Sequence, residues 1–331
     1  MAPILEVVHL AKSFGSLQAV KGISFTVDEG EVFGLLGPNG AGKTTTISML
    51  TGVIAPTGGT ACIGGKDIVR EALQVKRMIG LVPQDLALYP TLSARANLSF
   101  FGSIYGLSGR ELQERIDDVL EIVALTERQK EPIEKFSGGM KRRVNIAAGL
   151  VHQPHLLFLD EPTVGVDPQS RNHIFESVLK LNRERGMSII YTSHYMEEVE
   201  LLCNRVAIID QGQIIALDTI KNLISMLGGG VIQVGLRQAS DELVAQLGRL
   251  PAVKSTALAP LPVTVGNGSQ LAEAAAPETR VVKVEALNGQ QALVSVIGFL
   301  NASDIQITSL EILEPNLESV FLHLTGKKLR E

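Results

Sequence analysis

Short apolar runs alternate with amphipathic stretches from residue 4 to about residue 218. Several of these runs have the length and composition of strands buried in a sheet. They cover residues 32–36, 156–159, 188–192 and 206–209. Because helical patterns lie between them, the alternation predicts an α/β fold built on a mostly parallel sheet.

Residues 93–125 interrupt this alternation with a longer helical pattern. Charged positions are predicted to face outward at Glu111, Glu114, Arg115, Asp117 and Asp118. Apolar positions recur at helical spacing at Leu112, Ile116, Val119, Leu120 and Val123. The segment therefore reads as a helical insertion, solvated on one side and packed by the other.

A glycine triplet at 228–230 marks a break, after which the pattern changes. The residues that follow predict, in order, a strand, a helix, two strands, a helix and a strand. Their ranges are 231–236, 241–249, 252–257, 280–287, 290–301 and 304–313, with a Pro/Gly/Ala-rich loop between the second and third strands. This β-α-β-β-α-β order is the split ferredoxin-like arrangement. We therefore expect two domains, a larger one over 1–222 and a small α+β accessory or dimerisation domain over 229–331.

A last helix is expected to begin at Asn316, directly after Pro315, and to end at Gly326. It places Leu317, Val320, Phe321 and Leu324 on one face. Such an apolar stripe needs cover, which its own domain or a second protomer could supply.

The 331 residues are 45% hydrophobic, enough for a sizeable core, and carry 30 basic against 35 acidic side chains. This weakly acidic balance argues against a nucleic-acid partner. Cys62 and Cys203 fit no metal-ligand spacing and are expected to be buried and reduced. The N-terminus lacks the features of a signal peptide, and the longest apolar run, 292–300, is too short to cross a bilayer. Membrane association would therefore need a partner.

A phosphate-binding loop follows the strand at 32–36. Glycines at the required spacing are followed by lysine and threonine, and the loop opens a helix. The predicted nucleotide-binding residues are Gly37, Pro38, Asn39, Gly40, Ala41, Gly42, Lys43, Thr44 and Thr45. Backbone N–H groups and the helix N-terminus would hold phosphate, while Lys43 would reach the β- and γ-phosphates and Thr44 would bind Mg²⁺.

Two carboxylates, Asp160 and Glu161, end the apolar run at 156–159. The carboxyl ends of parallel strands face the ligand crevice of an open α/β sheet. Asp160 is therefore predicted to hold Mg²⁺, and Glu161 to polarise the attacking water. Alone, this pattern would indicate only a strand that enters a loop. Together with the phosphate loop, it favours a catalytic role for the two carboxylates.

A second glycine turn, Ser137-Gly138-Gly139, opens a basic helix that begins Met140-Lys141-Arg142-Arg143. Standing alone, Ser137 would be an ordinary helix cap followed by solvated basic side chains. With its preceding Phe136, the segment resembles the signature sequence of ATP-binding cassette (ABC) proteins. A second anion-binding helix start beside a complete phosphate loop suggests a site completed across a dimer.

The resemblance to the ABC family covers residues 4 to about 218 and implies a P-loop cassette with a helical signature subdomain. It implies that Phe14 stacks on adenine, although a core phenylalanine would fit the sequence as well. Gln84 matches the glutamine that senses Mg²⁺ and the attacking water and lies near the transmembrane partner. Asp167 matches the aspartate that crosses the dimer, and His194 matches the switch histidine near the γ-phosphate.

Two positions depart from the commonest signature: Met140 stands where glutamine is usual, and Phe136 where leucine is usual. The Met-Lys-Arg-Arg continuation resembles the branch that exports drugs, polysaccharides and haem-maturation components. Ser137 and both glycines remain, so the phosphate contacts stay available.

The resemblance implies an ATP- and Mg²⁺-dependent motor that works as a homodimer with an integral membrane permease. Such a subunit would be cytoplasmic and peripheral on the inner face of the cell membrane. The rivals are an importer subunit, a non-transport cassette acting on ribosomes or DNA, and a nucleotide-binding regulator without turnover. The C-terminal pattern favours an exporter over an importer. A single phosphate loop argues against the tandem cassettes of non-transport proteins, and the presence of Glu161 and His194 argues against a regulator without turnover.

Overall fold

The computed structural model describes residues 3–237, 239–259, 280–313 and 315–325. The chain divides into two compact units between Ile220 and Lys221. Within the described residues, none of the helices combines the length and the hydropathy needed to span a lipid bilayer.

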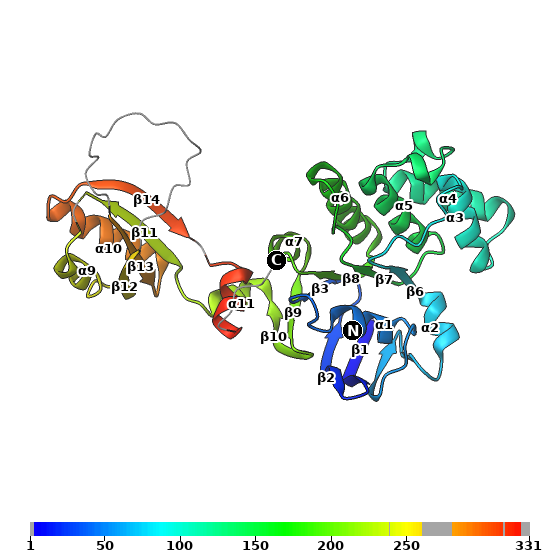
Figure 1. The fold of residues 1–331 in the computed structure, drawn as a ribbon, viewed down its shortest axis with the longest axis horizontal. Helices are drawn as coiled ribbons and strands as arrows, with labels where there is room; N and C mark the ends of the chain where they lie inside the picture. Colours follow the sequence, from blue (N-terminus) through cyan, green and yellow to red (C-terminus); the bar gives the residue numbers. More distant parts are fainter. Residues whose placement is uncertain (1–2, 238, 260–279, 314, 326–331) are drawn as a thin grey trace. The chain divides into compact units, whose positions relative to one another are not determined.

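The first unit is built on a six-stranded sheet with strand order β10-β9-β3-β8-β7-β6 (Figure 1). Its strands are β3 (Val32–Leu36), β6 (Ile79–Val82), β7 (Leu156–Asp160), β8 (Ser188–Ser193), β9 (Arg205–Asp210) and β10 (Gln213–Thr219). All neighbours pair in parallel except β9 and β10. The predicted mostly parallel sheet is therefore confirmed.

A second, antiparallel sheet precedes and follows the phosphate loop in sequence, with strand order β2-β1-β4-β5. It consists of β1 (Leu5–Phe14), β2 (Leu17–Val27), β4 (Gly58–Ile63) and β5 (Lys66–Asp67). The sequence pattern did not separate these strands from the parallel sheet. One face of the antiparallel sheet and α1 (Lys43–Leu50) share a core that includes Leu5, Phe25, Ile47 and Phe158.

The first unit contains further helices besides α1. They are α2 (Ala72–Met78), α3 (Ala94–Ile104), α4 (Gly109–Ile122), α5 (Gly138–Leu150), α6 (Pro168–Arg185) and α7 (Met196–Leu202), with 3₁₀ turns at Thr126–Arg128 and Ile133–Lys135. The expected single insertion at 93–125 is therefore two helices, because the chain turns after Ile104 and Ser108 starts a new one. The five predicted apolar positions of this segment are all buried.

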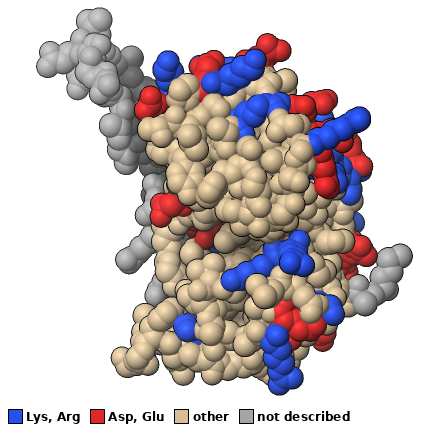
Figure 2. Space-filling model, turned by 90° about the vertical axis from the view of Figure 1, so that its right-hand side faces the viewer, with Lys and Arg blue, Asp and Glu red and all other residues tan. Residues whose placement is uncertain are grey.

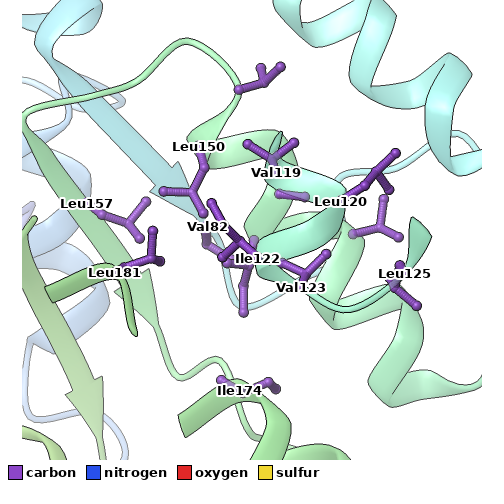
Figure 3. Packing of buried hydrophobic residues seen from close by; sticks show 14 of the residues in the cluster. Val82, Val119, Leu120, Ile122, Val123, Leu125, Leu150, Leu157, Ile174 and Leu181 are labelled. Atoms are coloured by element: carbon purple, nitrogen blue, oxygen red, sulfur yellow. The ribbon is translucent and has the colours of Figure 1, made fainter. Parts of the chain in front are cut away.

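Helices α4, α5 and α6 share a core with the edge of the parallel sheet (Figure 3). Val119, Leu120 and Ile122 of α4 belong to one buried cluster with Leu150 of α5 and Val82 at the end of β6. Because Val82 lies two residues before Gln84, this packing fixes the start of the segment that carries the glutamine.

The second unit contains β11 (Val231–Leu236), α9 (Asp241–Leu247), β12 (Val253–Ala259), β13 (Arg280–Ala286), α10 (Gly289–Ala302) and β14 (Ile307–Leu313). α8 (Ile220–Ser225) leads into this unit, and α11 (Leu317–Thr325) follows β14. The antiparallel sheet has strand order β12-β13-β11-β14. These elements follow the predicted β-α-β-β-α-β order, with boundaries that differ by up to three residues. The predicted loop after β12 and the predicted helix end at Gly326 lie outside the described residues.

The burial of individual side chains bears on two smaller expectations. Leu317, Val320 and Phe321 are buried within the single chain, so this part of the terminal stripe needs no second protomer, while Leu324 is half-buried. Cys62 and Cys203 are free thiols and are half-buried, not fully buried.

Candidate functional site

The loop between β3 and α1 presents backbone N–H groups to a ligand. Gly42 precedes α1 with φ of 108°, and no side chain caps the helix. A Cβ atom at Gly42 would lie 2.7 Å from the carbonyl oxygen of Ala19, so only glycine fits there. The uncapped first turn of α1 is consequently available to an anion.

Lys43 is nearly fully buried behind this loop. Its Nζ donates hydrogen bonds to the carbonyl oxygens of Gly37, at 2.8 Å, and Pro38, at 3.1 Å. It also pairs with Oε1 of Glu161 at 3.0 Å, and the two side chains are only 4% and 6% exposed. The ammonium is thus held at the loop with a buried counter-charge.

Asp160 and Glu161 lie at the end of β7, and Thr192 of the neighbouring strand β8 links them. Thr192 Oγ1 donates to Asp160 Oδ1 at 2.8 Å and accepts the backbone N–H of Glu161 at 2.8 Å. Thr44 Oγ1 donates to the same Asp160 oxygen at 3.3 Å. Burial raises the pKa of Asp160, and the two hydroxyl hydrogen bonds act against that rise.

Thr192 was missed from the sequence. One signal was present: Thr192 is a hydroxyl residue at the end of the predicted strand 188–192. Because the carboxyl ends of adjacent parallel strands meet at one sheet edge, such a residue can meet the carboxylates that follow the strand 156–159. The strand order needed to use that signal is absent from the sequence.

Glu161 also contacts His194, which follows β8. Glu161 Oε2 and His194 Nδ1 are 3.1 Å apart. The backbone of Glu161 has φ of 45°, in the left-handed region that side chains other than glycine seldom adopt. Such strain persists only where the surroundings fix the conformation, and it occurs mainly at functional sites.

These groups line one cavity of about 470 Å³. Of the predicted site residues, it is lined by Asn39, Gly40, Gly42, Lys43, Thr44, Thr45, Gln84, Glu161 and His194. Asp160 lies behind Thr44, and Ala41 is buried in the loop. The structure therefore brings the loop, the strand-end carboxylate, the glutamine and the histidine together around one space.

The signature helix α5 holds the backbone of Gln84. Arg142 donates to the carbonyl oxygens of Pro83, at 2.9 Å, and Gln84, at 2.6 Å, and it is only 5% exposed. Burial lowers the pKa of Arg142. This role could not be predicted from the sequence, because a Lys-Arg-Arg run at a helix start ordinarily indicates solvated side chains.

Ser137, Gly138, Gly139 and Asp167 form a separate group that does not line the cavity. Ser137 caps α5 by accepting the N–H of Met140, and Asp167 caps α6 by accepting the N–H of Ser170, which lowers the pKa of Asp167. A Cβ atom at Gly139 would lie 2.0 Å from Ser170 Oγ. The two helix starts are therefore packed directly against each other.

Phe14 also lies outside the cavity lining. It is 50% exposed at the end of β1, and Lys12 Nζ lies 5.1 Å from the centre of its ring. This exposure rules out the alternative of a core phenylalanine. A stacking role stays a prediction, and Ala19 of the paired strand β2 is the residue of this sheet that lines the cavity.

The donor set at Asp160 fits Mg²⁺. The described residues contain no cluster of three or more His, Cys, Asp or Glu side chains suited to a metal. Mg²⁺ in nucleotide sites uses few protein ligands, commonly one or two carboxylates together with water and phosphate oxygens. Asp160, Thr44 and Gln84 supply only oxygen ligands of this kind at the rear and side of one cavity.

Comparison with known proteins agrees with this geometry. Residues 20–164 match the family model described as ABC transporter. The chain is 46% identical to the linearmycin resistance ATP-binding protein LnrL of Bacillus subtilis, over 99% of this chain and 100% of that protein. It is 37% identical to the Nod factor export ATP-binding protein I of Ralstonia nicotianae, over 99% of this chain and 96% of the relative.

Among solved structures, the chain resembles cbiO1 of Clostridium perfringens, part of the ABC transporter complex cbiONQ. The TM-score is 0.63 at 28% identity, covering 75% of this chain and 95% of cbiO1. It also resembles the ATP-binding cassette MJ1267 in its ADP conformation, with a TM-score of 0.62 at 27% identity, covering 68% of this chain and 96% of that one. The chain therefore belongs to the ATP-binding subunits of ABC transporters, a family of ATPases.

Proposed function

We propose that this chain is the motor subunit of an exporter and hydrolyses ATP in the cavity lined by Lys43, Gln84, Glu161 and His194. The observation that carries the proposal is the convergence of these side chains on one space. Relatives that match over nearly the whole chain are subunits for antibiotic resistance and Nod factor export, which supports export over import. The cargo would be selected by the permease.

The proposed chemistry assigns a separate task to each residue. Lys43 and the N–H groups at the start of α1 hold the β- and γ-phosphates. Glu161 orients and polarises the attacking water, and His194 fixes the Glu161 carboxylate through the 3.1 Å contact. Asp160, Thr44 and Gln84 would hold Mg²⁺, which when bound neutralises developing phosphate charge.

A second subunit would complete the site. The ATP-binding cassette MJ0796 has a dimeric structure, and cbiO1 is part of a transporter complex. Because Ser137, Gly138, Gly139 and Asp167 lie together outside this chain's cavity, we propose that they serve the cavity of a second copy. The packing of α5 against α6 would then move both helix starts together when the dimer closes.

The permease is proposed to contact the region beside Gln84 and thereby to hold the chain on the cytoplasmic face of the membrane. Leu86, Tyr89, Leu92 and Phe100 are between 39% and 47% exposed, and the rings of Tyr89 and Phe100 meet edge to face at 4.9 Å. Figure 2 shows the end of the molecule that carries α3 and α4, where broad uncharged areas lie between charged margins. An exposed apolar surface of this kind suits a protein partner.

The second unit is proposed to support dimerisation or permease assembly without contributing to hydrolysis. None of the residues that line the cavity belongs to it. Among the described residues, its edge strand β14 pairs on one side only, and Leu310, Ile312 and Leu313 are 41%, 47% and 39% exposed. An apolar strand edge of this kind is suited to contact with another chain.

The test is ATP turnover by the purified chain, alone and after co-purification of its permease. Lys43→Ala should lower turnover at least about 100-fold, because it removes the charge that holds the phosphates. Lys130→Ala, at an exposed position, is the matched control. Phosphate release by folded Lys43→Ala near the wild-type rate would refute the assignment.

A further inference from the structure

Glu198 is a buried carboxylate that the roles proposed above do not use. It lies on α7 and is only 2% exposed. Three hydroxyl groups donate hydrogen bonds to it: Thr163 Oγ1 at 2.7 Å, Ser193 Oγ at 2.8 Å and Tyr191 OH at 3.0 Å. Burying a carboxylate costs free energy unless it is fully hydrogen-bonded, and the three hydroxyl groups satisfy this requirement for Glu198.

Two of these donors belong to the segments that carry the proposed water-orienting pair. Thr163 lies two residues after Glu161, and Ser193 directly precedes His194. Ser193 Oγ in turn accepts the N–H of Tyr195 at 2.9 Å. One carboxylate therefore ties together the loop that follows β7 and the loop that follows β8.

The backbone strain at Glu161 needs such a tie. A left-handed conformation at a residue other than glycine costs on the order of 1–3 kcal/mol and must be fixed by its surroundings. On the N-terminal side of the strained residue, the N–H of Glu161 donates a hydrogen bond to Thr192 Oγ1 at 2.8 Å. After it, the carbonyl oxygen of Glu161 accepts the N–H of Val164 at 3.3 Å, and Glu198 holds the side chain of Thr163 in the same loop.

Arg171 extends the tie to helix α6. Its Nε lies 3.7 Å from Glu198 Oε1, and its guanidinium lies 5.3 Å from the centre of the Tyr195 ring. The Tyr195 ring is 4.1 Å from that of His194. Arg171 is four residues after Asp167, the cap of α6, so the start of that helix is connected with the histidine segment through Glu198 and Tyr195.

We propose that Glu198 is a positioning residue for ATP hydrolysis: it holds the Glu161 and His194 segments in the one relative geometry that lets their side chains meet. The inference rests on the roles proposed for Glu161 and His194. Glu198 contacts neither the phosphate loop nor Lys43 in the described contacts, so its effect falls on turnover and not on ATP affinity.

The test compares Glu198→Ala with Glu197→Ala, the exposed neighbour on the same helix. Glu198→Ala should lower kcat about 10- to 100-fold, the size expected from a misplacement of about 1 Å, and leave the ATP dissociation constant within about twofold. Glu197→Ala should leave both unchanged. Equal kcat in folded Glu198→Ala and wild type, or parallel loss of kcat and ATP affinity, would overturn the proposal.

Thr163→Val is a milder variant that keeps the test valid if Glu198→Ala does not fold. It removes one hydroxyl donor to Glu198 and keeps the shape of the side chain. It should lower kcat, whereas Tyr191→Phe, which removes a donor from within the sheet, should lower Tm with little effect on kcat. If the two variants change kcat equally, Glu198 serves stability alone and the positioning role is wrong. If Glu161→Gln keeps full turnover, the proposed role of Glu161 fails instead, which separates the two conclusions.

Discussion

Replacing Glu161 with glutamine tests the buried pair at the centre of the site. Glu161→Gln keeps the side-chain shape but removes the counter-charge that lies 3.0 Å from Lys43 Nζ. Removing one partner of a buried ion pair typically costs about 3–5 kcal/mol, because the other charge is left uncompensated. The Asp160 carboxylate also acts on Lys43, so we expect the lower end, about 3 kcal/mol.

Thermal unfolding with and without ATP and Mg²⁺ measures this effect. For a unit of this size, about 3 kcal/mol corresponds to a fall in Tm of roughly 6–12 °C without nucleotide. Phosphates supply a replacement partner for Lys43, so saturating ATP should narrow the gap between variant and wild type. Turnover should fall at least about 100-fold. The same gap with and without nucleotide, or no fall in Tm, would refute the assigned pairing, and Glu197→Gln serves as the control.

Three further outcomes are expected. A chain truncated after residue 228 should still bind ATP, as isothermal titration would show, and should form the dimer or the permease complex more weakly, as light scattering would show. Loss of ATP binding in a folded truncated chain would mean that the C-terminal residues form part of the site. Burial lowers the pKa of His152, so the folded state disfavours protonation of this side chain. The free energy of unfolding should therefore fall as the pH drops below about 6.5, with a slope of at most about 1.4 kcal/mol per pH unit. His152→Gln should flatten that slope in urea titrations between pH 7.5 and 5.5, and an unchanged slope would contradict it. Arg142→Lys should lower turnover more than ATP affinity, because the paired hydrogen bonds to the backbone of Pro83 and Gln84 require a guanidinium.

Much of the fold could be predicted because its strands are buried on both faces. The run at 156–159 appears in the structure as part of β7, with every residue of the strand buried. The β1–β2 sheet escaped prediction because one face is solvated and its registers shift several times, which breaks a simple alternation. The turn after Ile104 was missed because helical periodicity continues across it, and Ser108 was not recognised as the start of a new helix.

The candidate site was predictable where chemistry is tied to local spacing and was not predictable where it depends on strand order. The loop from Gly37 to Thr44 and the Asp160–Glu161 pair are contiguous motifs. Thr192, Arg142 and Glu198 act through contacts made across 32, 58 and 35 residues of sequence, with Asp160, Gln84 and Thr163 respectively. Their residue types have many ordinary uses, so only the fold assigns them.

The contacts of Lys43 connect phosphate binding with activation of water in the proposed mechanism. Lys43 Nζ already donates to Gly37 and Pro38, and it has Glu161 as its third partner. An ammonium has three donors, so a bond to phosphate must replace one of these contacts. Exchange of the Glu161 contact frees one carboxylate oxygen, while His194 continues to hold the other. The phosphate that binds Lys43 therefore also leaves an oxygen of Glu161 free to accept a hydrogen bond from the attacking water.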